Sequence, residues 1–162
     1  METRDNLNSR HLPGLPERAG TQIRTITVPS VEDIDSDSVK VEKVELSDEY
    51  TRIDLIHYAD PHYISGGWVQ IYPETYIQPN GTPIKLKLLN VINIPIAPTK
   101  HYYKHGNDRI VFSLFFPALP QGVEYIDLIE KLSGGGSFFN VYGIRMREIN
   151  EGPISLDKFL MN

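Results

Sequence analysis

The sequence predicts an all-β protein in which antiparallel sheets pack face to face. Short runs of alternating apolar and polar residues recur about every ten residues along the chain. Almost no segment has the apolar period of a helix. The 162 residues include 12 Gly and 12 Pro, which suits a fold with many turns. We therefore expect an immunoglobulin-like antiparallel β-sandwich of about seven or eight strands.

The expected strands follow one another between residues 39 and 146. They cover residues 39–46, 50–58, 68–72, 75–78, 83–93, 100–103, 109–116 and 138–146. In the first of them the apolar face shifts by one position between Val41 and Val44, which predicts a β-bulge. Asn80-Gly81 is typical of a tight hairpin turn, so the strands on either side of it are expected to pair.

Three further segments complete the expected fold. Phe112, Leu114 and Phe116 alternate along residues 109–116, which predicts one buried face of a central strand. Residues 138–146 are apolar on both faces, which is also typical of a central strand. Residues 125–132 are expected to form a single helical turn.

The chain is expected to hold one folded domain with loose ends. Residues 1–37 predict a flexible or loosely docked N-terminal arm, in which residues 21–28 have the weak alternation of an edge strand. Residues 38–149 predict the β-sandwich, and residues 150–162 predict a C-terminal tail. Proteolysis is expected to remove the arm and leave the remainder folded.

Composition argues against several classes of partner and site. The net charge is −5, with 16 Lys and Arg against 21 Asp and Glu, so the basic stripe of a nucleic-acid binder is missing. There are no cysteines, which excludes disulfides, thiolate nucleophiles and Cys-ligated metals. No apolar stretch approaches the length of a membrane span, and residues 1–6 hold no signal-peptide core. We therefore expect no membrane span and no signal peptide in this chain.

No catalytic or metal-binding signature is found. Asp33, Asp35 and Asp37 have the spacing that opens a calcium loop, but Ser38 and Val44 stand where that loop needs Gly and Glu. The five histidines lack the spacing of a zinc site. The Gly-rich segment 133–137 lacks the Lys and the following helix of a phosphate-binding loop.

Acid–base chemistry is not expected either. Asp127 and Glu130 precede the Gly-rich segment, so their carboxylates are expected in solvent-like surroundings without the burial that raises a catalytic pKa. From the missing signatures we expect no enzymatic activity, no cofactor and no metal site.

Aromatic residues near strand ends and loops are the one feature that favours binding. Tyr63, Trp68, Tyr102 and Tyr103 are the candidate binding residues. Tyr and Trp offer an apolar ring with a polar handle, which suits stacking against a sugar or a peptide. The alternative is that these rings close the ends of the sandwich core.

Trp68 distinguishes these two interpretations. Gly66-Gly67 directly before it allows a tight entry into the sandwich, and Val69 and Ile71 make the neighbouring positions of the strand apolar. A strand that is apolar on both faces is typical of a sheet centre. The sequence therefore predicts Trp68 in the core, with a blue-shifted fluorescence emission.

Three runs give the chain a resemblance to a known class of domain. They are Phe112–Pro120, Ile126–Glu130 and Phe139–Ile144, supported by Gly67–Ile71 and Thr75–Ile77. About residues 39–146 resemble the β-sandwich domain that precedes the thioredoxin-like domain in some bacterial envelope thiol–disulfide oxidoreductases. The resemblance implies a β-sandwich and a setting in the periplasm or cell envelope. It implies no redox activity, because no Cys-x-x-Cys motif is present.

These observations lead to two functional hypotheses. The leading one is a non-enzymatic interaction or accessory module of a bacterial envelope system, with a protein partner. The alternative is a carbohydrate- or peptide-binding domain that uses the loop aromatics, with a cell-surface glycan as one candidate ligand.

Overall fold

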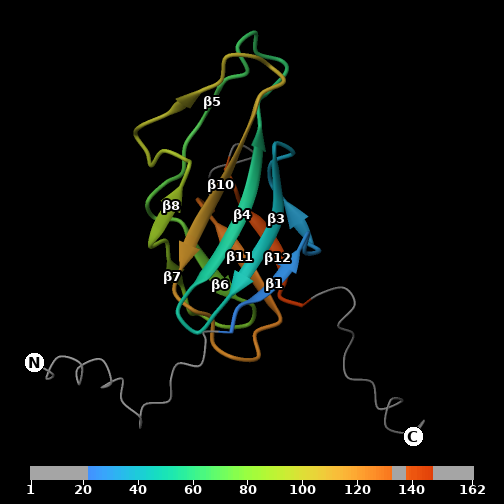
Figure 1. The fold of residues 1–162 in the computed structure, drawn as a ribbon, viewed down its shortest axis with the longest axis vertical. Coiled ribbons are helices and arrows are strands. Elements are labelled where there is room, and N and C mark those ends of the chain that lie inside the picture. The colour runs from blue at the N-terminus through green and yellow to red at the C-terminus, as the bar shows by residue number, and fades with distance from the viewer. Residues whose placement is uncertain (1–21, 133–137, 148–162) are drawn as a thin grey trace, which may run out of the picture.

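The computed structural model describes residues 22–132 and 138–147. The Gly-rich segment 133–137, most of the expected N-terminal arm and the expected tail at 150–162 lie outside the described residues. The described part forms twelve β-strands and no helix (Figure 1). They are β1 (Arg24–Thr27), β2 (Asp33–Ile34), β3 (Val39–Leu46), β4 (Thr51–Tyr58), β5 (Trp68–Val69), β6 (Tyr76–Pro79), β7 (Leu86–Lys87), β8 (Asn90–Ile92), β9 (His101–Tyr102), β10 (Arg109–Phe116), β11 (Tyr125–Ile129) and β12 (Val141–Arg145).

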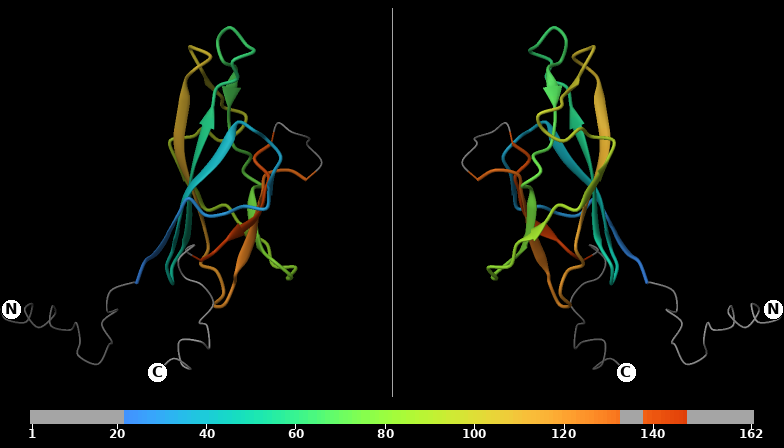
Figure 2. Two further views of the ribbon diagram at one scale, coloured as in Figure 1. Left: turned by 90° about the vertical axis from the view of Figure 1, so that its right-hand side faces the viewer. Right: turned by 90° about the vertical axis from the view of Figure 1, so that its left-hand side faces the viewer.

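Ten of these strands form two antiparallel sheets packed as a sandwich, which confirms the predicted fold class. The first sheet has the order β1-β3-β4-β10-β8, and the second has the order β2-β12-β11-β6-β7. β5 and β9 pair separately as a two-stranded ribbon. The two layers are seen edge-on in Figure 2. No helix in the described residues could cross a membrane.

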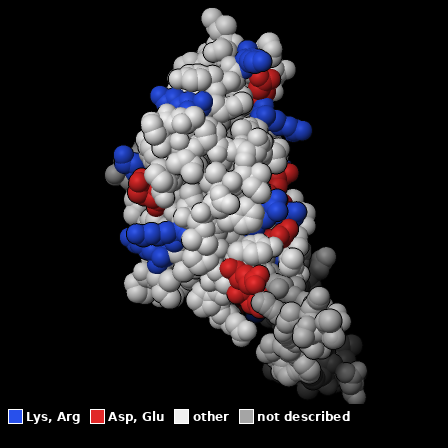
Figure 3. All heavy atoms as spheres, turned by 60° about the vertical axis from the view of Figure 1, so that its left-hand side comes forward, with Lys and Arg blue, Asp and Glu red and all other residues white. Residues whose placement is uncertain are grey.

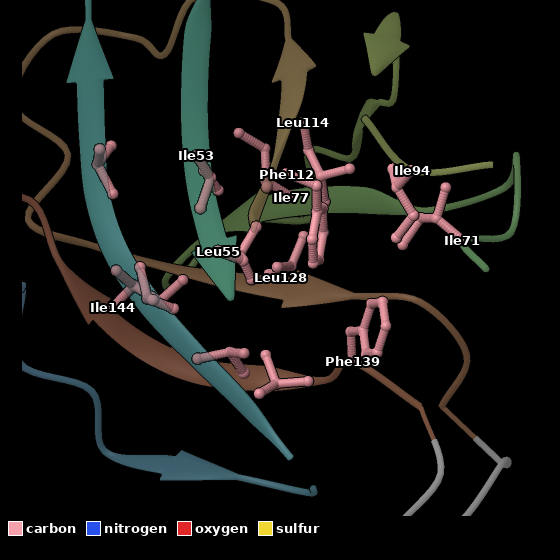
Figure 4. Packing of buried hydrophobic residues seen from close by; sticks show 14 of the residues in the cluster. Ile53, Leu55, Ile71, Ile77, Ile94, Phe112, Leu114, Leu128, Phe139 and Ile144 are labelled. Carbon is pink, nitrogen blue, oxygen red and sulfur yellow. The ribbon is translucent and has the colours of Figure 1, made fainter. Parts of the chain in front are cut away.

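The core lies between the inner faces of the two sheets. Ile53 and Leu55 of β4 and Phe112 and Leu114 of β10 are at most 1% exposed, and they face Leu128 and Ile144 of the second sheet (Figure 4). β10 lies between β4 and β8, so the prediction of a buried face on a central strand is confirmed. β12 lies between β2 and β11, so it is a central strand as well.

Local predictions in the first half of the chain also hold. The pairing of β3 with β4 shifts register between Val41 and Lys43, which is the expected bulge. β6 pairs with β7 across the Asn80-Gly81 turn, where Gly81 has a φ of 79°.

Within the expected N-terminal arm, β1 pairs with β3 and β2 pairs with β12. The sandwich therefore includes β1 and β2, and residues 24–34 contribute an edge strand to each sheet of the described part.

Two segments differ from the prediction. The expected strand 83–93 is divided between sheets, because Leu88 N–H donates to Thr75 O beside the second sheet and Leu89 N–H donates to Phe115 O of the first. The expected helical turn at 125–132 is wrong: it contains β11, in which Ile126 and Leu128 face the core. Short strands and this division raise the number of strands above the expected seven or eight.

Candidate functional site

The first sheet extends beyond the second at one end of the molecule. β10 pairs with β4 over all eight of its residues, whereas β11 and β12 are five residues long. β4 and β10 therefore rise past the second sheet, as Figure 2 shows. The β5–β9 ribbon covers this extension, and its residue Val69 is 2% exposed. The open end of the sandwich lies where the ribbon, the first sheet and the end of the second sheet meet.

A cleft of about 490 Å³ occupies this open end. Both sheets contribute to it: His57 from β4, Trp68 and Gln70 from β5 and the residue after it, and Glu130 and Phe139 from the β11–β12 side. Its other lining residues are Ser36, Ser38, Asp60, Tyr63, Ser65, Gly66, Gly67, Val69, Tyr72 and Phe138. The lining thus combines aromatic rings with hydroxyl, amide and carboxyl groups in one cavity.

Trp68 and Tyr102 lie side by side on the outer face of the ribbon. They are direct partners in the β5–β9 register, so their side chains share one face. Trp68 is 47% exposed and Tyr102 is 65% exposed. The prediction that Trp68 is a core residue is therefore wrong. The apolar alternation was real, because Val69 and Ile71 are buried, but the ribbon has no further sheet over its other face.

Tyr63 lies beside the same cleft, in the β4–β5 connection. Tyr63 N–H donates to Asp60 O and Gly66 N–H donates to Tyr63 O, which folds this connection into consecutive turns. Gly66 has a φ of 84°, and a Cβ there would lie 2.6 Å from His105 O, so only glycine fits without displacement. The ring of Tyr63 lies next to Gly67 and is 61% exposed as a residue.

Tyr103, the fourth candidate residue, lies in the core. It is 4% exposed, and its ring stacks on His57 with 5.7 Å between ring centroids. Its hydroxyl lies 2.8 Å from His57 Nδ1 and donates to the main-chain oxygen of the same residue at 3.1 Å. Burial raises the pKa of Tyr103 and lowers that of His57 to about 4. Tyr103 therefore offers no ring face to a ligand.

Glu130 is a buried carboxylate that the sequence did not reveal. We expected it in solvent, but it is 7% exposed. Its Oε2 accepts the N–H of Tyr72 and its Oε1 accepts the N–H of Phe139, each at 2.9 Å. Burial raises the pKa of Glu130, while these two N–H groups act in the opposite direction. Since the partners are main-chain groups, no residue pattern could have identified them.

Asn140, which directly precedes β12, supports Glu130. Asn140 is fully buried, and its Oδ1 accepts the N–H groups of Glu130 and Lys131 at 2.8 and 3.1 Å. Its Nδ2 donates to Lys131 O and to Asp35 Oδ2, each at 2.9 Å. The carboxylate and the amide together link the residues that follow β11 to those that precede β12.

The remaining candidate ligands for metals are dispersed. His57 is half-buried against Tyr103 and Phe139, whereas the exposed His62 contacts Asp60 at 2.9 Å. Asp35 accepts hydrogen bonds from Asn140 and Tyr142. Within residues 22–132 and 138–147, no three His or acidic side chains are grouped as metal ligands.

Comparisons with known proteins add no relative. No match was found among protein-family models, curated proteins or solved structures. The geometry of the chain itself therefore carries the functional argument. Sequence reasoning found three of the exposed aromatic residues at the open end, and it missed Gln70, Glu130 and Asn140, for which it had no signal.

Proposed function

We propose that this chain is a non-enzymatic recognition module that binds a saccharide at the open end of the sandwich. One observation carries the proposal: Trp68 is 47% exposed at the margin of a cleft of about 490 Å³ that also contains hydroxyl and carboxyl groups. An exposed indole keeps its apolar face in contact with water, and a ligand with a flat apolar face releases that water when it stacks on the ring. The C–H face of a sugar ring is such a surface.

The lining of the cleft favours a saccharide over an apolar ligand. Ser36, Ser38 and Ser65 contribute hydroxyl groups to the same cavity as the rings of Tyr63 and Trp68. A sugar presents hydroxyl groups around its edge and C–H groups on its face, so it needs this mixture of partners. Gln70 Oε1 is buried with no hydrogen-bond partner and suits a hydroxyl donor.

The acids of the cleft support binding rather than hydrolysis. Each oxygen of Glu130 already accepts a main-chain N–H, and Asp60 Oδ1 accepts the N–H and contacts the ring of His62. A general acid must release a proton to the leaving group during the reaction. Carboxylates committed to holding the backbone are better suited to shaping a site. A module of this kind is compatible with the accessory role expected from the sequence and with the envelope setting that the resemblance implies.

A second surface favours a protein partner instead. Val111 of β10 and Ile92 of β8 are 50% and 48% exposed on the outer face of the first sheet. Figure 3 shows a broad region without charged side chains on the β5–β8 side of the molecule. Exposed apolar residues of this kind are common at protein interfaces. Neither Val111 nor Ile92 lines the cleft, so substitutions distinguish the two hypotheses.

Trp68 fluorescence tests the saccharide proposal directly, because Trp68 is the single tryptophan of the chain. The free protein should emit at long wavelength, as a half-exposed indole does. Titration with a panel of neutral and acidic oligosaccharides should give a saturable change in emission for at least one of them. Trp68→Ala should weaken that binding, measured by calorimetry, by about thirtyfold, the cost of truncating an aromatic anchor, and Tyr102→Ala should weaken it less, because Tyr102 adjoins Trp68 but does not line the cleft.

Val111→Ser is the matched control, because it removes an exposed apolar side chain from the other surface. It should leave saccharide affinity unchanged. A blue-shifted emission, or no saturable response to any oligosaccharide, would contradict the proposal and leave the protein-binding hypothesis. Circular dichroism should show that the variants at Trp68 and Tyr102 keep the fold.

A further inference from the structure

Two lysines lie over aromatic rings that line the cleft. Lys100 Nζ lies 4.3 Å from the centre of the Trp68 ring. Lys131 Nζ lies 5.7 Å from the Tyr72 ring and 5.6 Å from the Phe138 ring. All three rings line the cleft, and neither lysine does. Each ammonium group therefore lies at the margin of the cleft, against a ring that borders it.

The acids that line the cleft are already engaged. Asp60 Oδ1 accepts the main-chain N–H of His62 at 2.8 Å. Nδ1 of the His62 ring lies 2.9 Å from the same oxygen. These contacts hold the pKa of Asp60 below its usual value. Glu130 accepts two main-chain N–H groups, as described above. The acceptor positions of these two carboxylates are thus partly occupied by the protein's own donors.

The two lysines have no such compensation within the described part of the chain. The ion pairs there involve Lys40, Lys43, Arg52, His62 and Arg147, and neither Lys100 nor Lys131 forms one. A contact with a ring face attracts an ammonium group but leaves its hydrogen-bond donors free. The ammonium groups of Lys100 and Lys131 therefore keep hydrogen-bond donors that are available to a ligand next to rings of the cleft.

From this arrangement we infer that the site takes an acidic saccharide, one whose sugar rings carry carboxylate groups. The inference rests on the proposed function and specifies its ligand. The apolar face of a uronic acid stacks on Trp68, and its carboxylate reaches the ammonium group of Lys100 or Lys131. A carboxylate accepts strong charge-assisted hydrogen bonds from ammonium donors. Neutral sugars of the same shape stack equally but leave both lysines without a partner.

The test compares matched sugars that differ only in the carboxylate. The probes are trimers of galacturonic, glucuronic and mannuronic acid, each beside the neutral trimer with the same linkage in which hydroxymethyl replaces carboxylate. Affinities are measured by calorimetry at low and at moderate salt. At least one acidic trimer should bind about tenfold more tightly than its neutral counterpart, and the difference should shrink as salt rises, because exposed charges are screened.

Substitutions locate the effect. Lys100→Gln and Lys131→Gln should each weaken binding of the acidic trimer by about threefold to tenfold, with little change for the neutral trimer. Lys100→Arg should restore the affinity, because it keeps the charge over the ring. Lys87→Gln is the control, since it removes an exposed lysine from β7, which does not line the cleft.

The outcomes separate this inference from the proposed function. Equal affinity for acidic and neutral trimers would overturn the inference while the saccharide site stands. Preference for the acidic trimer that survives both Lys→Gln substitutions would also overturn it. If no acidic or neutral trimer binds, both the inference and the proposed function fail. A carboxylate preference that Lys100→Gln or Lys131→Gln removes, and that Lys87→Gln leaves intact, supports the inference.

Discussion

His57 should make the stability of this protein fall steeply in weak acid. Its imidazole lies between Tyr103 and Phe139, with ring centroids 5.7 and 5.4 Å away. Burial lowers its pKa from 6.5 to about 4, because the charged ring would lose its hydration. The folded state therefore keeps His57 neutral over a pH range in which the unfolded chain binds a proton there.

The direction and size of the effect follow from this difference. The lowered pKa means that the contribution of His57 is complete above pH 6.5 and is lost as the pH falls towards about 4. Each pH unit in that window costs about 1.4 kcal/mol. Between pH 7.5 and 5.0 the loss is about 2 kcal/mol, an upper value because the ring is partly open to solvent.

Urea denaturation followed by circular dichroism measures this loss. Other groups also titrate in acid, so the useful quantity is the difference between the wild type and His57→Gln, which cannot bind the proton. The wild type should lose about 2 kcal/mol more than the variant between pH 7.5 and 5.0. With a typical slope of the unfolding free energy against urea concentration, the urea midpoint of the wild type should fall by about 1 M more than that of the variant.

His62→Gln is the matched control, because the side chain of His62 is 90% exposed. The His62→Gln variant should lose as much stability between pH 7.5 and 5.0 as the wild type does. Titration of the His57 ring by NMR provides an independent check, with a midpoint near pH 4. The reasoning would be refuted if His57→Gln lost as much stability in acid as the wild type, or if the His57 ring titrated near pH 6.5.

Two further predictions concern the fold. Phe112→Ala should lower the free energy of unfolding by about 3–5 kcal/mol, measured by urea denaturation, because a ring that is 1% exposed leaves a cavity; a loss below about 1 kcal/mol would show that the sheets repack around it. Gly66→Ala should destabilise the protein more than Gly81→Ala in the same assay. Both glycines have a φ near 80°, but only at Gly66 would the added Cβ approach a main-chain oxygen, that of His105. Equal losses of stability at the two positions would mean that the β4–β5 connection adjusts to the added Cβ of residue 66 without further cost.

Long strands were predictable because their alternation is long enough to read. β3, β4 and β10 each have eight residues, and even the bulge beside Val41 was visible as a shift of the apolar face. Strands of two residues such as β5 and β7 have no measurable period. The spacing of Ile126 and Ile129 imitates one helical turn, although both residues are buried in or at the end of a strand.

The division of the expected strand 83–93 could not be predicted locally. Leu88 and Leu89 are adjacent and chemically identical, yet their N–H groups bond towards opposite sheets. The choice depends on where Thr75 and Phe115 lie in three dimensions. A sequence pattern reports which residues avoid water, and it does not report which of two layers covers them.

The site was predictable in kind but not in detail. Aromatic residues at strand ends indicated a binding surface, but exposure depends on whether another layer covers the ribbon. One refinement was available from alternation: Tyr102 and Tyr103 are consecutive in an extended segment, so their side chains point to opposite faces. Only one of them could lie at the surface, and it is Tyr102.

The unequal length of the two sheets explains why the cleft lies at this end. The inner face of β4 and β10 continues past the second sheet, and exposed apolar surface there would be unfavourable. The β5–β9 ribbon buries it with Val69 and Tyr103, and this cover necessarily turns Trp68 and Tyr102 outward. A ribbon of two short strands contributes little to the core between the sheets. Trp68→Ala should therefore cost far less stability than Phe112→Ala, so the open end can vary its ligand contacts while the sandwich remains folded.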